Sequence, residues 1–272
     1  MSDAGRIIRL NRILRGNQHK ALIVAFDHAL VLGPIPGTED PAGQIQRFAA
    51  GGADAILLNL GLLQDCIASL ASAPTPVPGI IARIDWTTVW GAPERSGGGE
   101  LRSCLLARPE DALRHGADAV LTYLVVGTGD TDFEAKEVER NAQVARECER
   151  IGMPLIVETL ARGKQVANPS DSKWLNLHTR MAVELGASMV KTDYAGDPNS
   201  MRRVVDNCPV PIVVLGGSRY SSDEQALDVV RGAIAGGAAG ILFGRNVFQA
   251  ENMAVFLQKA RAVLDASPQV TR

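Results

Sequence analysis

Eight short runs of Val, Ile, Leu and Ala recur along this chain, and each precedes a stretch with helical periodicity. The runs are apolar at consecutive rather than alternate positions, which is typical of parallel strands covered by helices. The predicted strands are Ala21–Phe26, Ala55–Leu58, Gly79–Ile84, Ala119–Leu124, Pro154–Glu158, Ser188–Thr192, Pro211–Leu215 and Gly240–Phe243. Eight such units predict an α/β fold, a single closed (β/α)8 TIM barrel over residues 1–272, with a doubly wound open sheet as the alternative.

The segments between the strands predict the helices of the barrel. They span Gly43–Ala50, Leu62–Ala71, Ala112–His115, Glu134–Ile151, Lys173–Leu185, Ser200–Asn207, Asp223–Ala235 and Met253–Asp265. Regularly spaced arginines near the N-terminus predict a short amphipathic helix that caps the barrel, rather than a signal peptide. Two long connections, Asp85–Pro109 with a flexible Ser96–Gly99 and Arg162–Ser172, are either lids over the site or tolerated surface insertions.

Composition narrows the class of protein. The net charge of −2 gives no reason to expect nucleic acid or a membrane surface as a partner. Four widely spaced cysteines without a CxxC pair argue against a zinc site and a disulfide framework, so a cytoplasmic location is expected.

Glycines and an arginine follow the last two predicted strands. The seventh runs into Gly216, Gly217 and Ser218, and the eighth into Gly244 and Arg245. Barrels commonly bind phosphate between these two loops, where backbone N–H groups, a short helix N-terminus and an arginine can meet the anion. We therefore predict a phosphate site; the alternative is an ordinary turn with a surface arginine.

Lys191 ends the sixth predicted strand, inside an apolar pattern. Lysine is rarely buried, and a desolvated amine at a barrel mouth can attack a carbonyl. A lysine that reaches solvent, or pairs with Asp193 or Asp197, is the alternative.

Other polar residues end strands at the same mouth. Asp27 and His28 follow the first strand, Asp85 the third, and Glu158 ends the fifth. The carboxylates are candidates for proton transfer and His28 for substrate binding. Alternatively Asp27 caps a turn, His28 is a polar rim residue, and Asp85 and Glu158 pair with Arg83 or Arg162. Tyr123 and Tyr194 also end strands, as proton donors or as packed aromatics.

These motifs together resemble the archaeal-type class I fructose-bisphosphate aldolases, which are grouped with deoxyribose-phosphate aldolase and the autoinducer-2 phosphate thiolase. The resemblance extends from about Arg6 to the C-terminus, and its markers are RLNRIL (9–14), AFDHALVLGPIPG (25–37), GGADA (51–55), GMPLIVE (152–158), ELGASMVKTDYAGD (184–197), CPVPIVVLGGS (208–218) and GRNVFQ (244–249).

The resemblance implies that Lys191 is a Schiff-base lysine, Asp27 a catalytic carboxylate, and Gly216, Gly217, Gly244 and Arg245 the phosphate site. It also implies no metal or organic cofactor, and homo-oligomers that are often decamers. The sequence departs from the family at Leu160, where such aldolases usually have a proton-transferring tyrosine, at Leu60, and at Ile84-Asp85-Trp86. We therefore expect a phosphorylated carbonyl substrate other than fructose 1,6-bisphosphate, with Glu158 or Asp85 replacing the tyrosine.

Three alternative functions remain open at this stage. Within the family, a thiolase- or transaldolase-like transfer is one. A flavin-binding barrel oxidoreductase could use the same loops for the FMN phosphate. A non-catalytic phosphate-sensing barrel is the third, because the fold alone specifies no function.

Overall fold

A closed barrel of eight parallel strands forms the centre of the protein. The computed structural model describes residues 4–15, 19–73, 76–90, 101–163 and 165–266. The strands run in the order β1-β10-β9-β8-β7-β6-β3-β2, and β2 pairs with β1 to close the ring. Their bounds are β1 Ala21–Ala25, β2 Ala55–Asn59, β3 Gly79–Arg83, β6 Ala119–Val126, β7 Leu155–Ala161, β8 Met189–Thr192, β9 Ile212–Leu215 and β10 Gly240–Phe243. The predicted barrel is confirmed.

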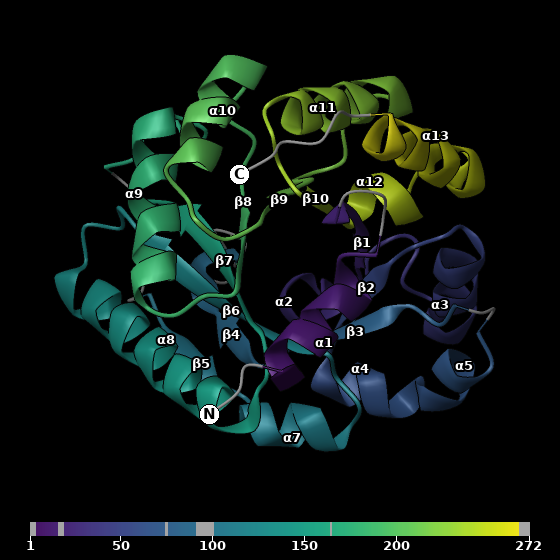
Figure 1. Cartoon of the computed structure of the whole chain (residues 1–272), viewed down its shortest axis with the longest axis horizontal. Coiled ribbons are helices and arrows are strands. Elements are labelled where there is room, and N and C mark those ends of the chain that lie inside the picture. The colour runs from purple at the N-terminus through teal and green to yellow at the C-terminus, as the bar shows by residue number, and fades with distance from the viewer. Residues whose placement is uncertain (1–3, 16–18, 74–75, 91–100, 164, 267–272) are drawn as a thin grey trace.

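Helices surround this ring, as Figure 1 shows. They are α2 Ala29–Leu32, α3 Pro41–Ala50, α4 Leu60–Asp65, α5 Ile67–Ala71, α7 Pro109–Arg114, α8 Thr131–Ile151, α9 Ser172–Glu184, α10 Pro198–Asp206, α11 Asp223–Ala235, α12 Arg245–Phe248 and α13 Met253–Asp265. The sequence pattern missed α2, and it merged α4 and α5, which Cys66 separates, into one helix.

The side chains of each strand alternate between two environments. Those facing the helices join one large apolar cluster, which includes Leu22, Val24 and Ile56. Those facing the barrel axis form a second cluster, made of Ala21, Ile23, Ala25, Ala55, Leu57, Ile81, Ala119, Leu121, Ile156, Met189, Val213 and Leu242. This alternation explains the unbroken apolar runs in the sequence, since both faces of every strand are buried.

Helix α1 (Ala4–Ile13) closes the N-terminal end of the barrel. Ile13 and Leu14 belong to the inner cluster, beside the first residues of the strands. In Figure 1 the helix lies across the ring rather than on its rim. The predicted capping helix is therefore present, and the open end of the barrel is the one where the strands finish.

The connection after β3 contains a small antiparallel hairpin that the sequence pattern missed. Strands β4 (Asp85–Thr87) and β5 (Ser103–Leu105) pair from Asp85↔Leu105 to Thr87↔Ser103, and the 3-10 turn η2 (Thr88–Trp90) follows β4. The predicted flexible segment Ser96–Gly99 lies outside the described residues. Asp85 therefore begins a strand, and it is not the first residue of an irregular loop.

Candidate active site

A cavity of about 170 Å³ opens at the carboxyl ends of the strands. Its polar lining residues are Asp27, His28, Arg83, Tyr123, Glu158, Lys191, Ser218 and Arg245, and Gly216, Gly217 and Gly244 complete the rim. Every catalytic or phosphate-site residue predicted from the sequence lines this cavity except Asp85. Of the two tyrosines considered as proton donors, Tyr123 lines the cavity and Tyr194 does not. Part of this convergence follows from the two-residue period of a strand. Asp27, Arg83, Tyr123, Glu158 and Lys191 each lie two positions beyond an inward-facing apolar residue, as Glu158 follows Ile156.

Lys191 lies at the floor of this cavity. It is only 5% exposed, and its Nζ is 2.8 Å from Oε1 of Glu158 on the neighbouring strand. The register of β7 and β8 sets Glu158 directly beside Lys191. The alternative partners are engaged elsewhere, since Asp193 pairs with Arg162 at 3.0 Å and Asp197 caps α10.

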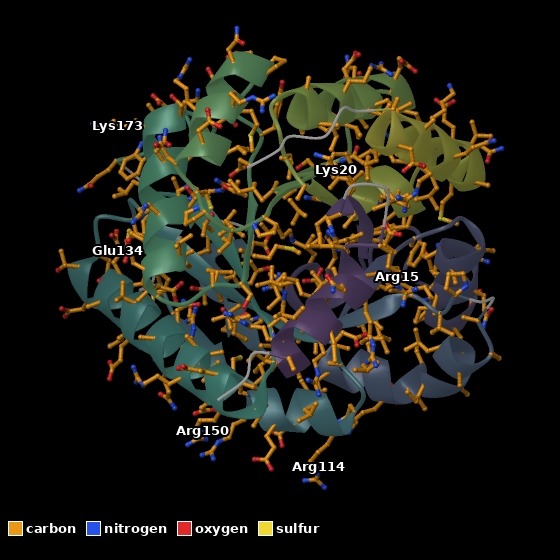
Figure 2. The ribbon with its side chains drawn as sticks, viewed as in Figure 1. Arg15, Lys20, Arg114, Glu134, Arg150 and Lys173 are labelled. Carbon is orange, nitrogen blue, oxygen red and sulfur yellow. The ribbon has the colours of Figure 1, made fainter. Side chains whose placement is uncertain are left out.

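Two of the described lysines are buried, and only Lys191 faces the cavity. Lys20 precedes β1 at the opposite end of the barrel, where its Nζ donates to the Ala238 carbonyl at 2.7 Å. Lys136, Lys173 and Lys259 are exposed. Figure 2 shows Lys20 within the ring of helices and Lys173 at its edge. The cavity thus contains one buried amine next to a carboxylate, which is the arrangement that imine chemistry requires.

Arg83, which the sequence analysis considered only as an ion-pair partner, joins the acidic residues of the site. Its guanidinium is 1% exposed and bonds to Asp27 through Nε, to Glu158 through Nη2, and to Asp85 through Nη1 at 3.3 Å. Arg83 lies two residues after Ile81, whose side chain faces the barrel axis, so its side chain must point to the same side of β3. This spacing is the sequence signal that could have identified Arg83 as a site residue. Asp27 and Glu158 each accept from Arg83 through one carboxylate oxygen. The second oxygen of Glu158 contacts Lys191, and the second oxygen of Asp27 is available to the cavity.

The charges around Arg83 determine which carboxylates are ionised. Burial alone would raise the pKa of Asp27, but Arg83 and Lys191 outweigh it, and the pKa falls well below its usual value. Asp27 is therefore an anion at neutral pH. It cannot donate a proton, but it can accept one or hold a substrate hydroxyl.

Asp85 is a supporting residue rather than a lining one. It is fully buried, accepts from the Tyr123 backbone N–H at 2.7 Å, and pairs with Arg140 at 3.2 Å as well as with Arg83. Burial raises its pKa to about 6 despite both arginines. Asp85 does not reach the cavity. Its geometry therefore favours a role in holding Arg83 in position, and not the direct proton transfer predicted from the sequence.

The position of the family tyrosine is apolar here. Leu160 is fully buried on β7, in a cluster with Tyr123, Phe133 and Leu215. Tyr123 on β6 does line the cavity, and its ring lies 3.8 Å from the Arg83 guanidinium carbon. Burial raises the pKa of Tyr123 far above 10, so its phenol remains neutral.

The opposite wall of the cavity is suited to an anion. The guanidinium of Arg245 has a buried Nε without a hydrogen-bond partner in the described structure, and burial lowers its pKa. No backbone hydrogen bond from Gly217 or Ser218 to a described residue is found. Gly217 adopts a φ of 62°, which glycine tolerates readily. These residues line the cavity and have donors without a partner among the described residues.

Gly244 and His28 are in tight contact on this wall. A Cβ on Gly244 would lie 2.1 Å from His28 Cε1, so only glycine fits. Burial lowers the pKa of His28 to about 4, although Asp27 Oδ1 lies 3.7 Å from its Nδ1. The imidazole is therefore neutral at pH 7 and can exchange hydrogen bonds without adding charge.

An apolar wall, as we call the apolar part of the lining, completes the cavity. Val31 and Leu32 of α2, Leu215 of β9 and Leu242 of β10 line it. Leu32 is 38% exposed and lies at the rim, whereas the other three are buried. This wall can accommodate carbon chain but offers no hydrogen bonds.

The described residues contain no group of three or more His, Cys, Asp and Glu side chains arranged to hold a metal ion. None of the helices in the described ranges is long and apolar enough to cross a bilayer.

Comparisons with known proteins agree with this geometry. The chain is 34% identical over 271 residues to 2-amino-3,7-dideoxy-D-threo-hept-6-ulosonate synthase of Halobacterium salinarum, covering 99% of this chain and 96% of that protein. It is 30% identical to the 3-hydroxy-5-phosphonooxypentane-2,4-dione thiolase of Yersinia enterocolitica, over 96% and 83% of the two chains. The structure of an archaeal fructose-1,6-bisphosphate aldolase with its catalytic lysine bound to a carbinolamine superimposes with a TM-score of 0.82, at 26% identity and over 96% and 100% of the chains.

The match to a defined family covers the whole barrel. The DeoC/LacD family of aldolases matches residues 21–250, from the first residue of β1 to beyond α12. Together with the barrel, this match identifies an enzyme of the class I aldolase type or a related carbon–carbon transferase. The chain belongs to the DeoC/LacD family of aldolases.

Proposed function

We propose that this protein is a Schiff-base aldolase for a phosphorylated keto or aldehyde substrate other than fructose 1,6-bisphosphate. The observation that carries the proposal is the buried Lys191 Nζ, 2.8 Å from Glu158, in a cavity that Arg245 also lines. The Nε of Arg245 has no partner in the part of the chain that the structure describes. The archaeal aldolase whose lysine is bound to a carbinolamine supports the same chemistry.

The phosphate of the substrate binds at the wall formed by Gly216, Gly217, Ser218, Gly244 and Arg245. Backbone N–H groups and an arginine that have no partner within the described ranges are the donors that a phosphate dianion recognises. Gly244 allows the backbone to approach closely. The carbonyl carbon of the substrate then extends toward Lys191.

The reaction begins when the neutral amine of Lys191 attacks the carbonyl. Glu158 Oε1 is positioned to accept the ammonium proton beforehand and to return it to the carbinolamine oxygen. Loss of that oxygen as water leaves a protonated imine. Its nitrogen accepts the electron pair of the neighbouring C–C bond when that bond breaks.

C–C cleavage needs a base for the hydroxyl proton of the leaving aldehyde. Asp27 is ionised and Glu158 Oε1 lies next to Lys191, so either group can take this proton without the tyrosine that Leu160 replaces. The remaining enamine takes a proton at carbon, and water hydrolyses the imine to release the product and the free lysine. Run backwards, the same steps join a donor to an aldehyde.

Borohydride trapping tests the proposal. The full chain is incubated with a panel of phosphorylated ketones, reduced with sodium borohydride and digested, and the adduct is located by mass spectrometry. We expect a covalent adduct on Lys191 with at least one compound, and none in Lys191→Arg, which keeps the charge. Absence of any adduct, or an adduct elsewhere, would contradict the proposal.

A thiolase-like transfer is the second candidate. The Yersinia thiolase, whose name specifies a phosphorylated dione, is similar to this chain over 96% of its length. Product formation that depends on added coenzyme A would favour this activity, and formation without it would favour aldol cleavage. A cytoplasmic location and a homo-oligomer, up to a decamer, remain predictions.

A further inference from the structure

A buried asparagine lies directly behind the loop that follows β9. Asn246, on α12, is 0% exposed. Its Nδ2 donates to the carbonyls of Gly216 at 2.9 Å and Ser218 at 3.0 Å. Its Oδ1 accepts from the Tyr220 backbone N–H at 2.9 Å and from Arg219 Nη1 at 3.4 Å. One side chain therefore holds residues 216–220 at several points.

These partners fix the orientation of the Asn246 amide. Carbonyl oxygens only accept hydrogen bonds, whereas a backbone N–H and a guanidinium only donate them. The nitrogen of Asn246 must therefore face Gly216 and Ser218, and the oxygen must face Tyr220. Aspartate has the same shape but would present a second acceptor to two carbonyls.

The bond to the Gly216 carbonyl also sets the direction of the next N–H group. The C=O of Gly216 and the N–H of Gly217 belong to one planar trans peptide and point in opposite directions. Gly216 and Gly217 line the cavity and Asn246 does not, so Asn246 lies on the far side of the loop. Because Asn246 binds the carbonyl from behind, the Gly217 N–H is directed toward the cavity.

The packing behind the loop permits little movement. A Cβ on Gly216 would lie 2.9 Å from Phe243 Cγ and 3.2 Å from Asn246 Nδ2. The loop thus rests directly on Asn246 and β10, and a change in Asn246 would reach the loop without an intervening side chain.

We propose that Asn246 is the positioning residue of the anion site: it never contacts the ligand, but it holds the Gly216–Ser218 loop with the Gly217 N–H aimed at the anion. The inference rests on the proposed function only in taking that anion to be the phosphate of the substrate. Binding of inorganic phosphate can be measured whether or not Lys191 forms an imine.

The test compares Asn246→Ala and Asn246→Asp with Asn141→Ala in the full-length protein. Asn141 is a matched control, because it is also 0% exposed and donates to the carbonyls of Tyr123 and Glu137 at 2.8 Å, far from the β9 loop. Titration calorimetry gives the dissociation constant for inorganic phosphate. Melting temperature and circular dichroism report whether each variant folds.

We expect both Asn246 variants to bind phosphate about tenfold or more weakly, since a hydrogen bond to a charged group is worth roughly that factor, and Asn141→Ala to stay within about twofold. Borohydride trapping should distinguish the phosphorylated from the unphosphorylated ketone. Asn246→Asp should need a higher concentration of dihydroxyacetone phosphate for half-maximal labelling, whereas its labelling by dihydroxyacetone should be unchanged.

Either of two results overturns the inference. One is a folded Asn246→Asp protein that binds inorganic phosphate as the wild type does; the other is a wild-type protein that does not bind inorganic phosphate at all. If the wild type binds phosphate but no carbonyl compound labels Lys191, the proposed function fails and the role of Asn246 is still decided by the phosphate titration.

Discussion

Replacement of Arg83 by methionine should destabilise the protein far more than an ordinary loss of an ion pair. The guanidinium is 1% exposed and bonds to Asp27, Asp85 and Glu158. After its removal Glu158 still has Lys191 and Asp85 still has Arg140, whereas Asp27 loses its directly bonded cation and keeps only the field of Lys191 and a neutral His28. An uncompensated buried charge costs about 3–5 kcal/mol, which we expect as the loss in free energy of unfolding at pH 7.

The pH dependence of this loss has a definite sign. In the folded wild type the pKa of Asp27 lies well below its ordinary value of 3.8, because Arg83 and Lys191 outweigh the effect of burial. Such a group adds stability that is present above pH 3.8 and lost as the pH falls through the folded pKa. Without Arg83, burial makes Asp27 bind a proton more readily than it does in the wild type. The gap between wild type and Arg83→Met should therefore be largest near neutral pH and should narrow as the pH falls.

Urea denaturation followed by circular dichroism at several pH values measures both effects. The control is Arg180→Met, because Arg180 is 57% exposed and pairs with Glu184, so its loss should change stability by less than about 1 kcal/mol. Adding Asp27→Asn to Arg83→Met should recover part of the stability, since a neutral side chain needs no counter-ion. A loss below about 1 kcal/mol, or two changes that simply add, would refute the reasoning.

The other predictions concern individual groups of the site and one buried histidine. Glu158→Gln should slow C–C cleavage by about two to four powers of ten while borohydride still labels the protein, and Asp85→Asn should slow it less; a larger effect from Asp85→Asn in single-turnover assays would reverse the assignment. Gly244→Ala should abolish phosphate-dependent labelling, because the new Cβ would lie 2.1 Å from His28 Cε1; unchanged labelling would disprove that contact. His178 is fully buried, and both of its ring nitrogens lack a partner among the described residues. Burial lowers its pKa from 6.5 to about 3, so the unfolded chain binds a proton more readily and the free energy of unfolding decreases as the pH falls from 6.5 toward 3. His178→Leu should therefore raise the free energy of unfolding by about 1–3 kcal/mol and flatten that acid-side slope in the same urea titrations, and a loss of stability would show that the ring has a partner such as water.

The barrel could be predicted from the sequence because both faces of every strand are apolar and helical segments separate the strands. The hairpin of β4 and β5 could not, since its strands are three residues each and pair with each other across a long connection. The predicted site residues converge because they all end strands of one ring. The exception is Asp85, whose partners Arg140 and Tyr123 lie on elements distant in sequence.

Two residues of the site needed the structure to be found. In the sequence Arg83 is predicted only as half of an ion pair, and only the closed ring shows that it binds carboxylates from β4 and β7 and from beyond the end of β1. Asn246 was part of a recognised motif, but its partners precede it by about thirty residues. The match to the aldolase family favours the carbonyl chemistry predicted from Lys191 over the flavin-binding and sensing alternatives.

The residues of the apolar wall can be substituted more freely than the charged residues of the cavity. Arg83 and its carboxylates depend on one another for charge, so any one of them can be replaced only at the expense of the rest. Leu32, in contrast, lies half-exposed on a four-residue helix at the rim and has no charge to balance. Divergence among related enzymes in the length or polarity of the substrate tail could therefore accumulate at this rim and leave the imine-forming amine undisturbed.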